Sequence, residues 1–154
     1  MPSVLFVCTG NQYRSPLAAA AFLKRLELDG RLGAAAWTVG SAGTWTASGL
    51  PPLPEALRVA RDLGLSLADH RTSALEAGAL SRSDLVLVME QGHKESILSE
   101  FPSARGKVHL LSEAVDQTAY DIPDPAAPDV ELAQVARQVY DLIGRGYESI
   151  CRLV

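Results

Sequence analysis

The residues that could do chemistry gather in one short stretch, "CTGNQYRS", residues 8 to 15. Cys8 is a potential nucleophile, and Arg14 follows it six positions later. A guanidinium matches the geometry of phosphate oxygens, and a helix N-terminus beside a cysteine favours the thiolate over the thiol. The Cys-to-Arg spacing is a weak motif by itself. Together with the glycine between them and the helix that follows, it predicts a loop that binds an oxyanion while its cysteine attacks phosphorus and forms a phosphocysteine.

The other residues of this loop fit the same interpretation. Gly10 lets the backbone approach a ligand closely, and Asn11 is the non-glycine type that best tolerates a left-handed conformation. Ser15 followed by Pro16 suits the N-cap and first position of a helix, and the Ser15 hydroxyl can also donate to the sulfur. We expect the anion to be bound by Thr9, Gly10, Asn11, Gln12, Tyr13, Arg14 and Ser15.

A proton donor for the leaving group is expected in "DIPDP", residues 121 to 125, which supplies two carboxylates. Prolines on both sides of Asp124 stiffen the loop and can aim that side chain. We therefore predict that Asp124 is the general acid and later the base for the attacking water, and that Asp121 matters less. The alternative is that one or both residues only begin turns, as Asp-Pro commonly does.

Two related loop chemistries do not fit. A nucleotide-binding P-loop ends in Gly-Lys-Ser/Thr, which this stretch lacks. A thiol redox motif needs Cys-x-x-Cys, and in this chain Asn11 stands three residues after Cys8, where that motif has its second cysteine.

Composition excludes several wider classes. The net charge of −4 argues against a nucleic-acid partner, and the absence of a long apolar run predicts no membrane span. With only two cysteines, Cys8 and Cys151, and no signal-peptide pattern, a reducing, cytoplasmic setting is expected. The three histidines, His70, His93 and His109, are scattered, so we expect neither a metal site nor a cofactor.

The elements that must position these residues alternate between strand and helix. Strands are expected at 3–8, 37–41, 84–90 and 107–111, and helices at 16–28, 54–62, 93–100 and about 129–153. This alternation predicts an α/β fold with a parallel sheet. Such sheets bind ligands at the carboxyl ends of their strands, which is where Cys8 and the "DIPDP" loop would lie. A chain of 154 residues, 47% apolar, fits one domain over residues 1–154.

Four segments resemble the low-molecular-weight protein tyrosine phosphatases in order and spacing: "VLFVCTGNQYRSPLA" (4–18), "SAGT" (41–44), "DLVLVM" (84–89) and "DIPDP". The resemblance implies a phosphatase I-like fold, a four-stranded parallel sheet of order 2-1-3-4 with helices on both faces. It implies metal-free, cofactor-free hydrolysis of phosphorylated proteins or small aryl phosphates. The family's nucleophile falls on Cys8, its phosphate-binding arginine on Arg14, its thiolate-stabilising serine on Ser15, its general acid on Asp124, its loop-shaping asparagine on Asn11, and its supporting serine and histidine on Ser41 and His70.

The chain departs from the family pattern at several positions. Tyr13 stands where many members carry a second cysteine, so a protective disulfide with the nucleophile is not expected. Ala126 and Ala127 replace an aromatic pair, which removes one wall of the phenol slot and a regulatory tyrosine site. Trp45 could replace that wall or could be an ordinary loop aromatic.

Relatives on this fold suggest alternative functions. Thioredoxin-coupled arsenate reductases need two further cysteines after the third strand, and this chain has none there. Protein arginine phosphatases share Thr9 but have Thr in place of Gln12, where tyrosine phosphatases commonly have an aliphatic residue. A catalytically idle phosphate-binding regulator is a third possibility, which the intact Cys8, Arg14 and Asp124 oppose. We expect Gln12 to point toward the rim of the anion site, with a weak preference for phosphotyrosine over phosphoarginine.

Overall fold

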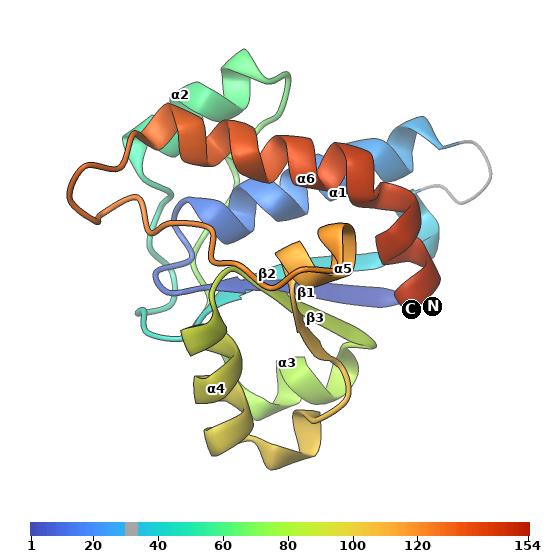
Figure 1. Cartoon of the computed structure of the whole chain (residues 1–154). Coiled ribbons are helices and arrows are strands. Elements are labelled where there is room, and N and C mark those ends of the chain that lie inside the picture. Colours follow the sequence, from blue (N-terminus) through green and yellow to red (C-terminus); the bar gives the residue numbers. More distant parts are fainter. Residues whose placement is uncertain (30–33) are drawn as a thin grey trace.

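A four-stranded parallel sheet lies between two layers of helices in the computed structural model (Figure 1). The structure describes residues 1–29 and 34–154. The strand order is β2-β1-β3-β4, and every neighbouring pair is parallel. These findings confirm the predicted α/β class, the strand order and the presence of helices on both faces.

The strands and helices lie close to the predicted positions. The strands are β1 (Ser3–Cys8), β2 (Thr38–Gly43), β3 (Leu85–Val88) and β4 (Val108–Leu110). The α-helices are α1 (Arg14–Leu28), α2 (Pro54–Asp62), α3 (Ala77–Arg82), α4 (Gln91–Glu100), α5 (Leu111–Asp116) and α6 (Leu132–Leu153), with short 3-10 turns η1 (Ala34–Ala36) and η2 (Pro102–Ala104). The sequence did not predict α3 and α5, because helices of six residues are too short to show a clear apolar period.

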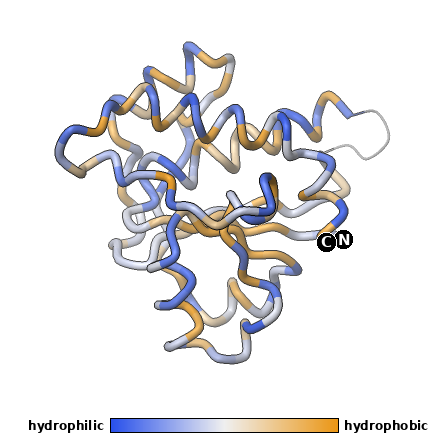
Figure 2. The backbone as a smooth tube through the Cα atoms, in the orientation of Figure 1, coloured by the Kyte–Doolittle hydropathy of each residue, from blue (hydrophilic) through white to orange (hydrophobic). Residues whose placement is uncertain are grey.

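Strand β1 is the centre of the core. All of its residues are buried, as expected for a short apolar run between two helical layers. Val4, Phe6 and Cys8 face a core cluster shared with α1, α2, α5 and α6, while Leu5 and Val7 face a second cluster shared with α3 and α4. Figure 2 shows the hydrophobic residues concentrated along these central strands.

The sheet brings the site together at the carboxyl ends of β1 and β3. The Met89 N–H donates to the Val7 carbonyl at 3.2 Å, and the Ile122 N–H donates to the Met89 carbonyl at 2.9 Å. The loop that contains Asp121 and Asp124 is thereby hydrogen-bonded to the end of β3, beside the end of β1. These bonds explain how residues more than a hundred positions apart in sequence share one site.

Helix α1 begins earlier than predicted, and the N-cap assignment was wrong. The helix begins at Arg14, and its first carbonyl acceptor is Tyr13, which accepts from the Leu17 N–H at 3.1 Å. Ser15 therefore lies inside the first turn, where its hydroxyl is buried and bonded within the loop. Pro16 is accommodated because N–H groups of a first helical turn have no partner within the helix.

The longest helix, α6, is amphipathic and covers the α1 side of the sheet (Figure 1). Its buried residues recur at helical spacing, at Val135, Ala136, Val139, Leu142 and Ile143. Charged residues occupy the opposite face. Among the described helices, none combines the length and apolarity needed to cross a membrane.

A close contact between α5 and α6 should make Gly146 sensitive to substitution. A Cβ atom at Gly146 would stand 2.8 Å from Val115 Cγ1 and closer still to Cγ2, whereas at Gly144 the nearest neighbour, Arg25 Nη1, would be 3.9 Å away. We expect Gly146→Ala to lower the free energy of unfolding by about 1–2 kcal/mol, since overpacking outweighs the better helix propensity of alanine. Gly144→Ala, the matched control, should be neutral or stabilising by up to about 1 kcal/mol.

Urea unfolding of both variants measures this difference. Adding Val115→Ala to Gly146→Ala should recover part of the lost stability, because it removes the atoms that clash. Equal stability of the two glycine variants would contradict the close packing of α5 on α6.

Candidate active site

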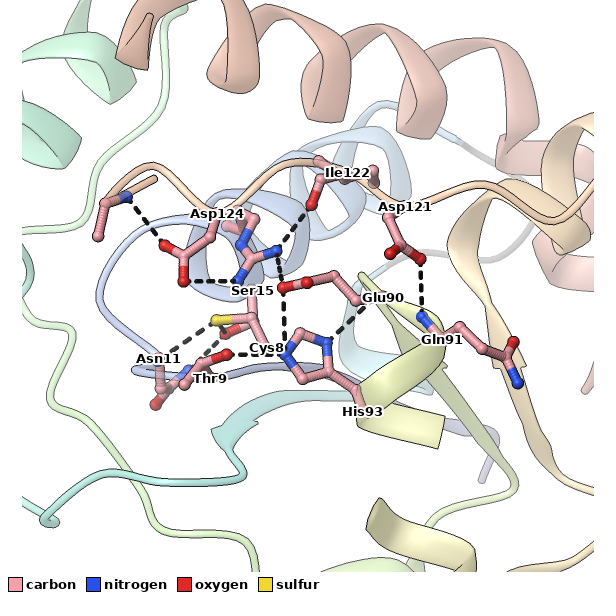
Figure 3. Close-up of polar contacts among 12 residues, drawn as sticks. Cys8, Thr9, Asn11, Ser15, Glu90, Gln91, His93, Asp121, Ile122 and Asp124 are labelled. Atoms are coloured by element: carbon pink, nitrogen blue, oxygen red, sulfur yellow. Dashed lines mark hydrogen bonds and ion pairs between the residues drawn. The ribbon is translucent and has the colours of Figure 1, made fainter. Parts of the chain in front are cut away.

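The loop between β1 and α1 surrounds the Cys8 sulfur (Figure 3). The Asn11 backbone N–H points to Cys8 Sγ at 3.3 Å, and Ser15 Oγ lies 3.0 Å from the same atom. Only 3% of Cys8 is exposed. The sulfur thus lies near the beginning of α1, with the Asn11 N–H on the loop side and the Ser15 hydroxyl on the helix side.

Asn11 anchors this loop through every polar group it has. Its φ is 58°, the left-handed conformation that its residue type predicted. Its side-chain amide donates to Ser15 Oγ at 2.8 Å and to Ser41 Oγ at 3.0 Å, and its Oδ1 accepts from the Ser73 N–H at 2.9 Å. Its carbonyl accepts from His70 Nε2 at 2.8 Å. The structure therefore brings Ser41 and His70 into contact with the loop, as the resemblance implied.

Arg14 is buried with a carboxylate beside it. Its side chain is 2% exposed, and its Nη1 donates to Glu90 Oε2 and to the Ile122 carbonyl, both at 2.7 Å. Its Nη2 lies 4.0 Å from Asp124 Oδ2. Nη1 is thus occupied by protein acceptors, so Nε and Nη2 are the donors that an oxyanion can use.

The two aspartates of the 121–125 loop have different surroundings (Figure 3). Asp124 lines the same cavity as Cys8, and its Oδ1 accepts from the Ala126 N–H at 2.9 Å. Asp121 instead accepts from the Gln91 N–H at 2.8 Å, at the start of α4. The structure therefore places Asp124, and not Asp121, beside the sulfur cavity.

A cavity of about 320 Å³ opens above the loop. Its mouth carries Trp45, which is 85% exposed, together with Leu53, Pro125 and Ala126. The Trp45 N–H donates to the Thr9 carbonyl at 3.1 Å, which fixes this backbone next to the loop. The loop residues that line the cavity are Cys8, Thr9, Gly10, Asn11, Gln12, Tyr13 and Arg14.

Gln12 lines the cavity, but part of its side chain is already bonded. The side-chain Nε2 of Gln12 donates to the Pro51 carbonyl at 2.8 Å, and the backbone carbonyl of Gln12 accepts from the Leu53 N–H at 3.1 Å. Since a carbonyl can only accept, the Gln12 amide orientation is fixed. Oε1 then lies 4.0 Å from where a Cβ atom on Gly10 would stand.

Tyr13 connects the loop to the last helix. Its hydroxyl donates to the Leu132 carbonyl at the beginning of α6. Burial raises the pKa of Tyr13 to about 12, and the negative charge of Glu55 adds to the rise. The residue that replaces the family's second cysteine is therefore a neutral structural contact at neutral pH.

Sequence reasoning missed two residues that contact this site, Glu90 and His93. Glu90 contacts Arg14, and His93 Nε2 lies 2.8 Å from Thr9 Oγ1. A signal for Glu90 was present, because it lies two residues after the third strand, at the edge of the sheet that also holds Cys8. His93 follows Glu90 by three residues, the spacing of a helix capping box, and the structure contains that box.

In the described part of the chain, the other reactive side chains form neither a disulfide nor a metal site. Cys151 lies in α6 and packs against the core. Within residues 1–29 and 34–154, no group of three or more His, Cys, Asp or Glu side chains is arranged to hold a metal ion.

Comparison with known proteins agrees with this geometry. The family model for low molecular weight phosphotyrosine protein phosphatase matches residues 3–152. A protein-arginine-phosphatase of Geobacillus stearothermophilus is 37% identical over 148 residues, which cover 96% of this chain and 95% of that protein. A probable low molecular weight protein-tyrosine-phosphatase, EpsP, of Ralstonia nicotianae is 35% identical, covering 96% of this chain and 92% of that protein.

The solved structures give the same assignment. A mutant of the YwlE arginine phosphatase, with a phosphorylated active-site serine, superposes with a TM-score of 0.86 at 29% identity and covers 99% of both chains. The matched residues include the whole Cys8 loop, its supports and the 121–125 loop. This chain belongs to the low molecular weight phosphotyrosine protein phosphatase family.

Proposed function

We propose that the protein dephosphorylates phosphorylated proteins in two metal-independent steps through a phosphocysteine on Cys8. The observation that carries this proposal is that Cys8, Arg14 and Asp124 line one cavity at the N-terminus of a helix. The related structure with phosphate on its active-site serine supports a covalent phosphoenzyme in this family. We further propose that residues 1–154 act as one phosphatase domain in the reducing cytoplasm, where a catalytic thiol stays reduced.

In the first step, the Cys8 thiolate attacks phosphorus. An S–P bond forms and the bond from phosphorus to the leaving group breaks, while protonated Asp124 donates its proton to the leaving atom. Arg14 and the loop amides bind the non-bridging oxygens, whose charge they match in the transition state. The Ser15 hydroxyl, 3.0 Å from the sulfur, stabilises the thiolate before the attack.

In the second step, water attacks the phosphocysteine. The Asp124 carboxylate accepts a proton from the water, the P–S bond breaks, and inorganic phosphate and the Cys8 thiolate are released. One residue can serve both steps because it becomes a carboxylate when it protonates the leaving group. The Asp124 side chain is 44% exposed, so its carboxyl group can exchange protons with solvent at the mouth of the cavity.

Asn11, Ser41 and His70 are proposed as supports of the loop and not as reacting groups. Asn11 donates to Ser15 and Ser41, and its backbone carbonyl accepts from His70. It therefore holds the loop amides in the conformation that the anion requires. A preformed site needs no reorganisation when the charge develops.

Phosphotyrosine is the first candidate for the substrate residue, on the basis of the family. Trp45 offers an exposed aromatic face beside the cavity, and a stacked aromatic pair contributes about 0.5–1.5 kcal/mol beyond its buried area. We propose that Trp45 supplies the wall that Ala126 and Ala127 lack. Small aryl phosphates should enter the same slot.

A specific observation favours phosphoarginine as a second candidate. Gln12 lines the cavity, and because its Nε2 donates to Pro51, its acceptor, Oε1, lies 4.0 Å from where a Cβ atom on Gly10 would stand. A phosphorylated guanidinium has N–H donors for such an acceptor, whereas the phenyl ester of phosphotyrosine has none. Trp45 can stack on either group, so it does not discriminate between them.

The nucleophile is tested by Cys8→Ser. We expect this variant to remain folded and to lose essentially all turnover of an aryl phosphate, because a serine hydroxyl is not ionised by this loop. Vanadate should inhibit the unchanged protein competitively, and EDTA should have no effect on its rate. Loss of activity in EDTA, with circular dichroism unchanged, would contradict the metal-independent mechanism.

The general acid is tested by Asp124→Asn, with Asp121→Asn as the matched control. Asparagine at 121 keeps the oxygen that accepts from Gln91, so this variant should retain most activity. Asp124→Asn should slow turnover of a phosphotyrosine peptide by roughly 10²–10⁴-fold. The loss should be far smaller with p-nitrophenyl phosphate, whose leaving group needs little protonation. A larger loss at 121 than at 124 would reverse the assignment.

Substrate choice is tested by Gln12→Leu, which has similar size but no acceptor. The ratio of kcat/KM for phosphoarginine peptides to that for phosphotyrosine peptides should fall by about tenfold, the value of one good hydrogen bond at a desolvated site. Unchanged inhibition by vanadate serves as the control that the loop is intact. An unchanged ratio would mean that Gln12 does not select the substrate. If the unmodified protein prefers phosphoarginine peptides by at least tenfold, arginine replaces tyrosine as the assigned residue.

A further inference from the structure

A buried histidine, His93, lies next to the loop between β1 and α1, which we call the phosphate loop (Figure 3). It lies in the first turn of α4 and is 5% exposed. Its Nδ1 accepts from the Glu90 backbone N–H at 3.1 Å, and its Nε2 lies 2.8 Å from Thr9 Oγ1. Both ring nitrogens are therefore used, one toward the helix and one toward the loop.

The first of these contacts fixes the tautomer of the ring. A backbone N–H can only donate, so His93 Nδ1 has no proton, and a neutral imidazole must then carry its proton on Nε2. Burial and, next to it, the positive charge of Arg14 lower the pKa of His93 to about 4, although Glu90, Asp121 and Asp124 act in the opposite direction. The ring is therefore neutral at pH 7. His93 Nε2 lies 3.6 Å from Glu90 Oε2, but a neutral ring does not form an ion pair with this carboxylate.

The second contact then has a defined direction. His93 Nε2 donates, and Thr9 Oγ1 accepts. The hydroxyl proton of Thr9 cannot point to the ring, and within the described part of the chain it has no other acceptor. Thr9 lines the cavity above Cys8, so that proton is available to a ligand there.

We infer that His93 is a positioning residue that holds the Thr9 hydroxyl with its proton directed into the cavity, and that Thr9 is a side-chain donor to the bound phosphate. This inference rests on the phosphate site proposed above and adds a donor to it. The Thr9 hydroxyl complements the loop amides and Arg14, which bind the other faces of the anion. A hydrogen bond to a charged group typically changes a binding constant by about tenfold or more.

The test is the affinity for inorganic phosphate, measured by calorimetry at pH 7 on a double-mutant cycle of Thr9→Val and His93→Leu. Thr9→Val keeps the shape of the side chain and should weaken phosphate binding by about tenfold. His93→Leu should weaken it several-fold, but should have no further effect in the presence of Thr9→Val. His93→Gln should restore most of the affinity, because its carbonyl can accept from the Glu90 N–H while its amide donates to Thr9.

Two results would overturn the inference. An unchanged affinity in Thr9→Val would remove the proposed donor, and equal effects of His93→Leu with and without Thr9→Val would show that His93 does not act through Thr9. If His93→Leu does not fold, the ¹⁵N NMR shifts of His93 in the unmodified protein decide the matter. The Nε2–H tautomer at pH 7 is required, and an Nδ1–H tautomer or a charged ring contradicts it.

The proposed function fails separately from this inference. Phosphate binding is measured without turnover, so an inactive protein with intact coupling between Thr9 and His93 would contradict only the proposed chemistry of Cys8.

Discussion

The left-handed conformation of Asn11 is the constraint on which the rest of the site depends. A loop that turns its amides toward an anion cannot use them in a sheet or helix, so other bonds must hold it in shape. Asn11 is fully buried, with a φ of 58°, and its backbone and side chain bond Cys8, Ser15, Ser41, His70 and Ser73. These bonds offset the cost of a left-handed non-glycine residue, which is about 1 kcal/mol or more. They also connect the loop to β2 through Ser41 and to the segment after α2 through His70 and Ser73. The shape of the anion site therefore depends on these neighbouring segments as well as on the loop itself.

The buried charge of Arg14 is the second requirement of the site. A guanidinium that is 2% exposed needs partners, because an unpaired buried charge is strongly destabilising. Glu90 and the Ile122 carbonyl supply them on one amino group only. The protein thereby stabilises the cation and still leaves donors for the substrate. Since Glu90 follows β3 and Ile122 belongs to the acid-bearing loop, the same contacts hold Asp124 close to the phosphate loop.

Much of this arrangement could be predicted from local sequence, and the parts that could not depend on long-range contacts. Strand β1 was predicted with its observed ends because its apolar run is continuous, and Asn11 was predicted in its observed conformation from residue type. The place of the 121–125 loop at this edge of the sheet was expected from its position after the fourth strand, and Asp124 was preferred over Asp121 because prolines flank it and because of the family resemblance. Ser15 was wrongly assigned as an N-cap because its hydroxyl bonds the sulfur and Asn11, contacts that local propensity does not include. Glu90 and His93 contact residues 76 and 84 positions away. Their places in the sequence put Glu90 near the end of the third strand and His93 at a capping-box spacing, but the contacts with Arg14 and Thr9 appear only in the folded sheet.

In the proposed reaction phosphate passes through Cys8, and the phosphocysteine intermediate can be detected directly. The unmodified protein would be mixed with a phosphotyrosine peptide, denatured within milliseconds, digested and analysed by mass spectrometry. We expect phosphate on the peptide that contains Cys8, at a level that rises before the steady state in step with release of the dephosphorylated peptide. Phosphate found on another side chain, or turnover with no phosphorylated Cys8 at any time, would contradict it.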